Sequence, residues 1–156
     1  MRVYLARHSN AVPEDRFLPD DYRYLSAEGR HKARGVAGVL HGEGIAVDAI
    51  LSSPLTRAIQ TAEILASGIG FDGAIEADVG LCPGASPHVL TETIAGRTGA
   101  ILVVGHMPSI CHLGGLLIGK PGFPPFKPGH VFAFDGTTPL FKVDPDRLEV
   151  EALLVA

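Results

Sequence analysis

Two arginines and two histidines occupy positions from which they could bind an anion together. Arg7 and His8 end a short run of alternating apolar residues. Arg57 follows a Ser-Ser-Pro turn, and His106 follows the glycine that closes an Ile-Leu-Val-Val run. No carboxylate stands beside them in the sequence. Because the planar guanidinium fork matches two phosphoryl oxygens at once, this set predicts a phosphate site.

A histidine in such a site can take part in the reaction. Its neutral ring has a nucleophilic nitrogen that can accept a phosphoryl group covalently. Positive neighbours disfavour the imidazolium form, and they stabilise charge on the transferring oxygens. The residue types therefore favour phosphoryl transfer through a phosphohistidine intermediate.

Strands and helices alternate along the chain, which predicts an α/β fold with a mainly parallel central sheet. Ser26 and Ser53 are the predicted N-caps of the first two helices, and Pro54 is the predicted first residue of the second. Ligands of such folds bind beyond the carboxyl ends of the strands. We predict strands over residues 1–6, 48–51, 74–77, 100–105, 131–134, 140–143 and 148–155, and helices over 26–40, 53–66, 86–95 and 109–118.

Composition indicates one folded domain over residues 1–156. Of the 156 residues, 46% are hydrophobic and 19% are charged, which is enough apolar material for a core despite 19 Gly and 12 Pro. The net charge of −4 argues against a nucleic-acid partner, and no apolar run is long enough to cross a membrane. Cys82 and Cys111 lack CxxC spacing, and the N-terminus does not resemble a signal peptide, so we expect a cytoplasmic protein.

Several blocks of the sequence resemble the histidine phosphatase superfamily, which has the phosphoglycerate mutase-like fold. They are Arg7-His8, the block Ser-Pro-Leu-Thr-Arg-Ala-Ile-Gln-Thr-Ala over residues 53–62, and Gly105-His106. Residues 23–30 and the Gly-His-Met-Pro segment over residues 105–108 are similar to blocks of its SixA-type phosphohistidine phosphatases. The blocks occur in the expected order over residues 1–120, and the resemblance implies a three-layer sandwich with helices on both faces of the sheet.

The resemblance also implies roles for individual residues. His8 is the expected nucleophile, and Arg7, Arg57 and His106 are expected to hold the phosphoryl group. Arg23 matches an arginine that approaches the pocket in SixA-type members. No metal or other cofactor is implied, and no metal-ligand set stands at the usual spacing.

This chain departs from the family pattern at Ser9, where most relatives have glycine. A serine is strained there only if the backbone needs a positive φ, and its hydroxyl could narrow the pocket or bind phosphate. A second departure is the stretch 81–86, which has no acid where larger relatives have a catalytic Glu or Asp. Glu76 and Asp78 lie just upstream and could substitute.

The missing acid favours a phosphohistidine substrate, since a protonated imidazole leaves more easily than an alkoxide. The sequence thus predicts a cofactor-independent phosphatase acting on a phosphohistidine of a phosphorelay or phosphotransfer protein. One alternative is a phosphatase for small-molecule phosphate esters or anhydrides. A second is a non-catalytic domain that binds phosphorylated proteins.

Overall fold

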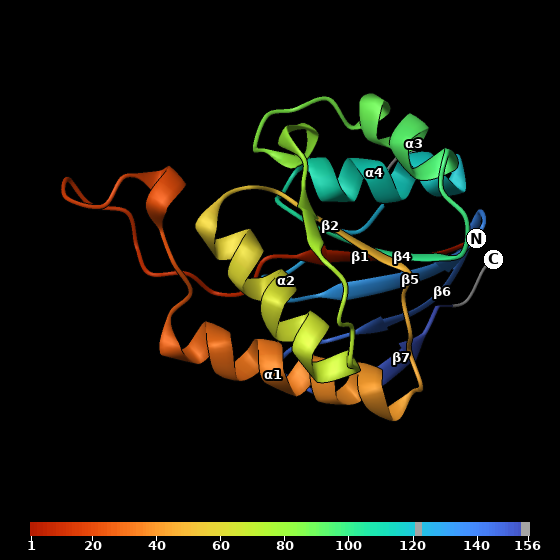
Figure 1. Ribbon diagram of the computed structural model, residues 1–156, viewed down its shortest axis with the longest axis horizontal. Helices are drawn as coiled ribbons and strands as arrows, with labels where there is room; N and C mark the ends of the chain where they lie inside the picture. Colours follow the sequence, from red (N-terminus) through yellow and green to blue (C-terminus); the bar gives the residue numbers. More distant parts are fainter. Residues whose placement is uncertain (121–122, 154–156) are drawn as a thin grey trace.

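A seven-stranded mixed sheet forms the centre of the protein, seen here in a computed structural model that describes residues 1–120 and 123–153 (Figure 1). Its strand order is β3-β2-β4-β1-β5-β6-β7. The strands are β1 (Arg2–Arg7), β2 (Ala49–Ser52), β3 (Ile75–Ala77), β4 (Ala100–Gly105), β5 (Val131–Asp135), β6 (Thr138–Val143) and β7 (Val150–Ala152).

The parallel part of the sheet consists of β3, β2, β4 and β1, and the other three strands pair antiparallel. The prediction of a mainly parallel sheet is therefore right for the half that holds the site. The other half differs because β5 and β6 are joined by only two residues, Gly136 and Thr137, which permits a hairpin and no crossover. Gly136 has φ 58°, which suits this tight turn.

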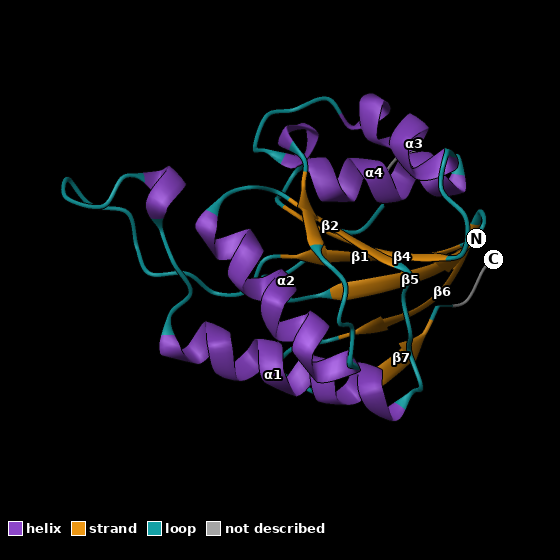
Figure 2. Cartoon of the chain, viewed as in Figure 1, coloured by secondary structure: helices purple, strands orange, loops and turns teal. Residues whose placement is uncertain are grey.

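Helices cover both faces of the sheet (Figures 1 and 2). Helices α1 (Ala27–Gly42) and α2 (Thr56–Ile69) lie on one face, and α3 (Pro87–Ala95) and α4 (Ser109–Ile118) lie on the other. Two short 3-10 helices, η1 (Asp20–Tyr22) and η2 (Val79–Leu81), complete the elements. The three-layer sandwich predicted from the sequence is confirmed. No helix of the described residues has the length and apolar character needed to cross a membrane.

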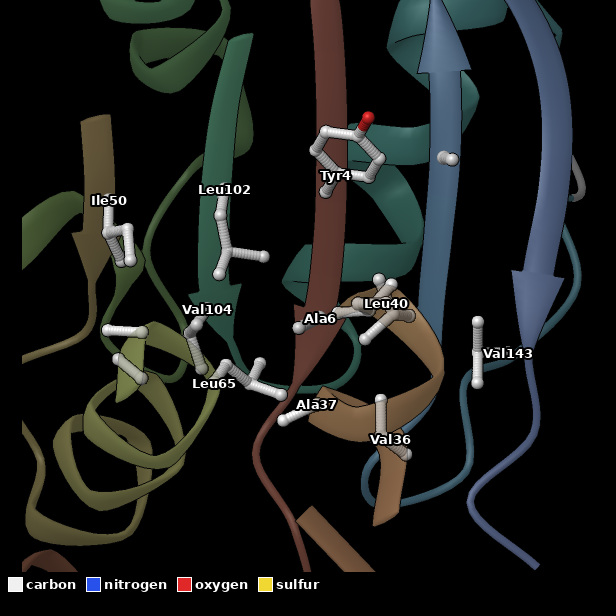
Figure 3. Packing of buried hydrophobic residues seen from close by; sticks show 14 of the residues in the cluster. Tyr4, Ala6, Val36, Ala37, Leu40, Ile50, Leu65, Leu102, Val104 and Val143 are labelled. Carbon is white, nitrogen blue, oxygen red and sulfur yellow. The ribbon is translucent and has the colours of Figure 1, made fainter. Parts of the chain in front are cut away.

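Successive side chains of β1 point to opposite faces of the sheet, so this strand contributes to both hydrophobic cores of the sandwich. Tyr4 and Ala6 face α1 and α2, where they pack with apolar residues such as Leu40 and Leu65 (Figure 3). Val3 and Leu5, on the opposite face, belong to the core under α3 and α4. In β4 the residues from Ile101 to Gly105 are all buried, as the continuous apolar run predicts for a strand covered on both faces.

Helix starts agree with the sequence in one case and differ in another. The Ser26 side chain accepts a hydrogen bond from the Gly29 amide, so it is the predicted N-cap of α1. Helix α2 begins at Thr56, and the prediction of a Ser53 cap with Pro54 as first helical residue is wrong. The Ser53 hydroxyl accepts from the Leu55 amide in a turn before the helix.

The C-terminal strand is shorter than predicted. Of the expected strand 148–155, residues 150–152 form β7, and residues 154 and 155 lie outside the described residues. Leu148 has φ 55°, which is not a strand conformation.

A long connection between β1 and α1 projects from the carboxyl side of the parallel strands (Figure 1, red to orange). This segment, residues 11–25, is called the arm below. A bridge between Ala11 and Leu25 closes its base, and the Leu25 amide donates to Gln60 Oε1 of α2 at 2.8 Å. The arm is largely loop, which agrees with the absence of a predicted strand or helix between residues 6 and 26, and η1 lies near its end (Figure 2).

Candidate active site

His8 and His106 lie next to each other because β1 and β4 are parallel neighbours. Arg7 pairs with Gly105 in the register, so the two histidines leave the sheet at the same level. The His8 amide donates to the Gly105 carbonyl at 3.0 Å. The ring centroids are 5.1 Å apart, and the ring planes are tilted by 53°. Two residues almost a hundred positions apart thus share one edge of the sheet.

His8 is held as a neutral ring with one nitrogen free. Its Nδ1 lies 2.7 Å from the Ser9 carbonyl oxygen, which can only accept, so Nδ1 has the hydrogen and Nε2 has the lone pair. The residue is 8% exposed. Burial lowers the pKa of His8 to about 4, with help from Arg57 and Arg7, although the bond to Ser9 opposes this shift. His8 is therefore a neutral imidazole at pH 7, with one ring nitrogen free.

His106 is also neutral and has one unpaired nitrogen. Its Nε2 lies 2.7 Å from the Ser53 hydroxyl oxygen. Its Nδ1 is buried and has no hydrogen-bond partner among the described residues. Burial lowers the pKa of His106 to about 3, and His8 and Arg57 add to the effect. The Ser53 hydroxyl can donate to Nε2, which would leave Nδ1–H as a donor for an anion.

Arg7 and Arg57 extend the set of donors. Arg7 Nη1 donates to the Phe126 carbonyl at 2.9 Å, and burial, followed by the charge of Arg57, lowers the pKa of Arg7. Arg57 is 4% exposed, and its two terminal nitrogens donate to Asp20. Each arginine has a buried Nε without a partner among the described residues. Unpaired buried donors are rare, so their presence on both arginines and on His106 points to an oxyanion ligand.

Arg23 reaches the same region from the arm. Its Nη1 donates to Asp20 Oδ1 at 3.0 Å, and its Nε donates to the Val12 carbonyl at 2.8 Å. It is close enough that its charge contributes to the lowered pKa of His8. The structure therefore links Arg23 to Arg57 through one carboxylate, that of Asp20.

Ser9 connects the site to two helices. Its hydroxyl donates to the Gly29 carbonyl of α1 at 2.7 Å, and its amide donates to Thr61 Oγ1 of α2 at 3.0 Å. It is fully buried, and its φ is not positive, because Leu148 is the one non-glycine with positive φ in the described part of the chain. Serine is thus unstrained in the glycine position, and its hydroxyl is engaged with α1 in place of the phosphate contact considered above.

Glu76 and Asp78, the two acids that could substitute for the missing general acid, form hydrogen bonds outside the site. Both carboxylate oxygens of Glu76 accept from Arg97 at 2.8 Å. Asp78 accepts from the Gly80 amide at 2.8 Å and caps η2. Neither contacts the histidines or arginines of the site, so the structure does not support them as general acids.

Sequence reasoning missed four contributors to this site. No role was predicted for Asp20, and Ser53 was predicted to be a helix cap. Thr61 Oγ1 donates to the Arg57 carbonyl at 2.8 Å and so ties Ser9 to the helix of Arg57. The Phe126 carbonyl that receives Arg7 comes from a loop with no recognisable motif. The Asp-Asp-Tyr-Arg run was the available signal for Asp20, since its spacing from Arg23 suits a local ion pair.

Comparison with known proteins identifies the family of this site. Residues 3–93 match the model of the histidine phosphatase superfamily (branch 1). The chain belongs to the histidine phosphatase superfamily. The matched range includes Arg7, His8 and Arg57, and His106 lies beyond it, directly after β4.

Individual superfamily members resemble the chain to different degrees. It is 27% identical to the phosphohistidine phosphatase SixA of Escherichia coli in an alignment 121 residues long that covers 72% of this chain and 71% of that protein. The structure of the protein histidine phosphatase SixA complexed with tungstate superimposes with a TM-score of 0.87 and 23% identity, covering 96% of this chain and all of that one. The chain therefore has the fold of SixA.

Another superfamily structure has a different substrate in its name. A mycobacterial glucosyl-3-phosphoglycerate phosphatase superimposes with a TM-score of 0.64 and 19% identity, covering 85% of this chain and 88% of that one. The same fold thus occurs in phosphatases of proteins and of small molecules, and the substrate has to be argued from the site.

Proposed function

We propose that this protein is a phosphatase that removes the phosphoryl group from a phosphohistidine on a protein. The observation that supports this most is the state of His8. It is a buried, neutral imidazole with a free Nε2, beside three buried donors, two arginine Nε atoms and His106 Nδ1, that have no partner in the described chain. Such a set can bind a phosphoryl group and attack it.

In the first step, His8 Nε2 forms a bond to phosphorus while the bond between phosphorus and the substrate's imidazole nitrogen breaks. The electron pair of the broken bond stays on the substrate nitrogen, which leaves as a neutral imidazole once its ring is protonated. Arg7, Arg57 and His106 Nδ1–H stabilise the charge on the transferring oxygens. The Ser9 carbonyl accepts from Nδ1–H and so stabilises the positive charge that develops on the His8 ring.

In the second step, water attacks the phosphorus of phospho-His8. The N–P bond breaks, its electron pair returns to His8 Nε2, and inorganic phosphate leaves as dihydrogen phosphate, which contains the oxygen and both protons of the water. No residue in this scheme requires a metal or other cofactor. Both steps use the same three donors, since the transferring oxygens occupy the same pocket in each.

The surroundings of the site support a phosphohistidine over an ester. The carboxylate that contacts the site arginines is Asp20, and its pKa is lowered, first by the hydrogen bond from Arg23, so it is a poor proton donor at neutral pH. A sugar alkoxide would need such a donor more than an imidazole would. The 27% sequence identity with the phosphohistidine phosphatase SixA of Escherichia coli also favours a phosphohistidine substrate.

The arm supports a protein substrate over a small molecule. Phe17, Tyr22 and Tyr24 are the exposed aromatic side chains of the described residues, and all three belong to the arm. Phe17 is 81% exposed, and Arg16 lies over its ring at 4.6 Å. Tyrosine, phenylalanine and arginine are enriched at protein interfaces, so these side chains suit contact with a folded partner.

The main experiment measures phosphate release from a phosphohistidine-containing protein and from a panel of sugar and nucleotide phosphates. We expect His8→Ala to lose activity by at least about a thousandfold, since the nucleophile is gone. His31→Ala, on the exposed face of α1, is the matched control and keeps full activity. Wild-type activity in His8→Ala would refute the mechanism, and faster turnover of a small phosphate would refute the substrate assignment.

Trapping of the intermediate separates an enzyme from a binding domain. Rapid quenching of wild-type protein with labelled substrate should give an acid-labile, base-stable label on His8. A protein that binds phosphoproteins without reaction would stay unlabelled and would release no phosphate.

A further inference from the structure

Asp20 holds two arginines of the candidate site from the arm. Arg57 Nη1 donates to its main-chain carbonyl at 2.7 Å, and Arg57 Nη2 donates to its Oδ2 at 3.1 Å. Arg23 Nη1 donates to its Oδ1 at 3.0 Å. We propose that Asp20 is a positioning residue that orients the Arg57 guanidinium for the phosphoryl group and joins Arg23 to it. This inference rests on the proposed role of Arg57 as a phosphate ligand.

The contacts to Arg57 determine which of its donors stay free. A guanidinium has five N–H groups in one plane, and Asp20 accepts from both terminal nitrogens of Arg57. Two contacts from one residue prevent rotation of this plane. The Nε–H group remains buried without a partner in the described chain. Asp20 thus fixes the group while leaving Nε–H available for an oxyanion.

Charge gives the second reason for a carboxylate at this position. Arg57 is 4% exposed, and Arg57 and Arg23 both donate to the Asp20 carboxylate, so two positive charges lie close together and repel each other. The Asp20 side chain is 42% exposed, whereas the Arg57 side chain that it contacts is 4% exposed. It offsets the repulsion between Arg57 and Arg23 and lets both stay near the pocket when no phosphate is bound.

Asp20 is placed by the fold of the arm. It begins η1, whose first-turn backbone bond from the Tyr22 amide to the Pro19 carbonyl is 3.0 Å long. The bridge at the base of the arm and the bond from Leu25 to Gln60 connect this segment to the helix that bears Arg57. The arm therefore presents Asp20 to Arg57 without a substrate.

The test compares Asp20→Asn with Asp21→Asn in the full chain. Asp21 is the adjacent residue of the arm and is exposed, and no site residue donates to it among the described contacts. Both variants remove one negative charge from the same segment, so they differ in the contact to Arg57. The measurements are the dissociation constant of inorganic phosphate by calorimetry, and kcat and KM on the phosphohistidine protein across pH.

Positioning and simple charge predict opposite results for phosphate binding. If Asp20 orients Arg57, Asp20→Asn should weaken phosphate about tenfold and lower kcat/KM by about 10- to 100-fold, with the pH profile unshifted. If Asp20 acts only as a negative charge near an anion site, Asp20→Asn should bind phosphate more tightly. Asp21→Asn should stay within about twofold of wild type.

Asp20→Glu gives a second variant, because it keeps the carboxylate with one extra methylene. We expect it to recover part of the affinity and of kcat/KM that Asp20→Asn loses. Tighter or unchanged phosphate binding in Asp20→Asn, or equal effects of Asp20→Asn and Asp21→Asn, would overturn the inference. Phosphate binding is measured without turnover, so an inactive wild type would refute the proposed function and still leave this result readable.

Discussion

At the scale of single residues, the site combines two buried, uncharged histidine rings with arginines that are cationic and incompletely hydrogen-bonded. His8 and His106 have pKa values lowered to about 4 and about 3, mainly because they are buried. The cost of removing them from water is tolerable because each ring stays neutral. A neutral imidazole beside cationic guanidiniums is an arrangement that is ready for a phosphoryl group before any substrate binds.

The lowered pKa of His8 predicts the acid limb of activity. A free histidine with a pKa of 6.5 would be half protonated at that pH, but His8 in the folded protein keeps its lone pair until the pH approaches about 4. We expect kcat/KM, corrected for ionisation of the substrate, to stay level from pH 7 to about pH 5 and to fall through about pH 4. An acid limb centred near 6.5 would contradict this.

At the scale of elements, the end of β1 and the first turn of α1 approach each other closely. Ser9 Oγ donates to the Gly29 carbonyl, and the Ser26 amide donates to the Asn10 carbonyl at 3.0 Å. A Cβ atom at Gly29 would lie 1.9 Å from the Asn10 carbonyl oxygen. A glycine is required at this point of α1 because of this contact with backbone, which cannot rotate away.

Gly29→Ala should therefore destabilise the protein by about 1–3 kcal/mol, since the strand end or the helix must shift to relieve the overlap. The shift also moves Ser9, so kcat should fall. Gly38→Ala in the same helix is the matched control, because a Cβ there meets nothing within 4 Å. We expect that control to gain about 0.5–1 kcal/mol from reduced freedom of the unfolded chain. Urea unfolding checks both, and equal effects would contradict this reading.

At the scale of the whole molecule, the order of the strands decides which residues meet. β4 lies between β2 and β1 and is parallel to both, so Arg7, His8 and His106 emerge at one edge with the turn that leads to Arg57. The antiparallel half of the sheet contributes fewer groups to the candidate site. Its contribution is the loop before β5, from which the Phe126 carbonyl accepts a hydrogen bond from Arg7.

Burial of the histidines also couples the stability of the molecule to pH. The folded-state pKa of His8 is about 4, below the 6.5 of an unfolded chain, so below pH 6.5 the unfolded state binds more protons. The free energy of unfolding should therefore fall as the pH drops from about 6.5 to about 4, by about 3 kcal/mol for His8 alone. His106 acts in the same direction.

Urea unfolding of wild type and His8→Gln at pH 7, 6 and 5 measures this dependence. The variant lacks the His8 titration, so its free energy of unfolding should change less over this range. Parallel pH curves for the two proteins would mean that His8 is not titrating differently in the folded and unfolded states.

Residue types and their order along the chain were enough to predict the α/β sandwich and the buried strand β4, and they indicated Arg7, His8, Arg57 and His106 as candidates for a phosphate site. These features depend on local patterns, since apolar alternation, helix caps and guanidinium–imidazole chemistry are visible within a few residues. The antiparallel half of the sheet, the start of α2 and the length of β7 were not predicted correctly from the sequence. Hairpin pairing and turns depend on contacts outside the local pattern.

Tertiary structure alone decided how the site is completed. Asp20 and Arg57 are 37 residues apart, and Ser53 and His106 are 53 apart, so neither contact has a local signal. The same holds for the Ser9 hydroxyl, which is engaged with α1, and for Glu76 and Asp78, which lie in other interactions. Burial, protonation and free donors result from atoms that distant segments bring together, and a linear pattern of residues does not contain that information.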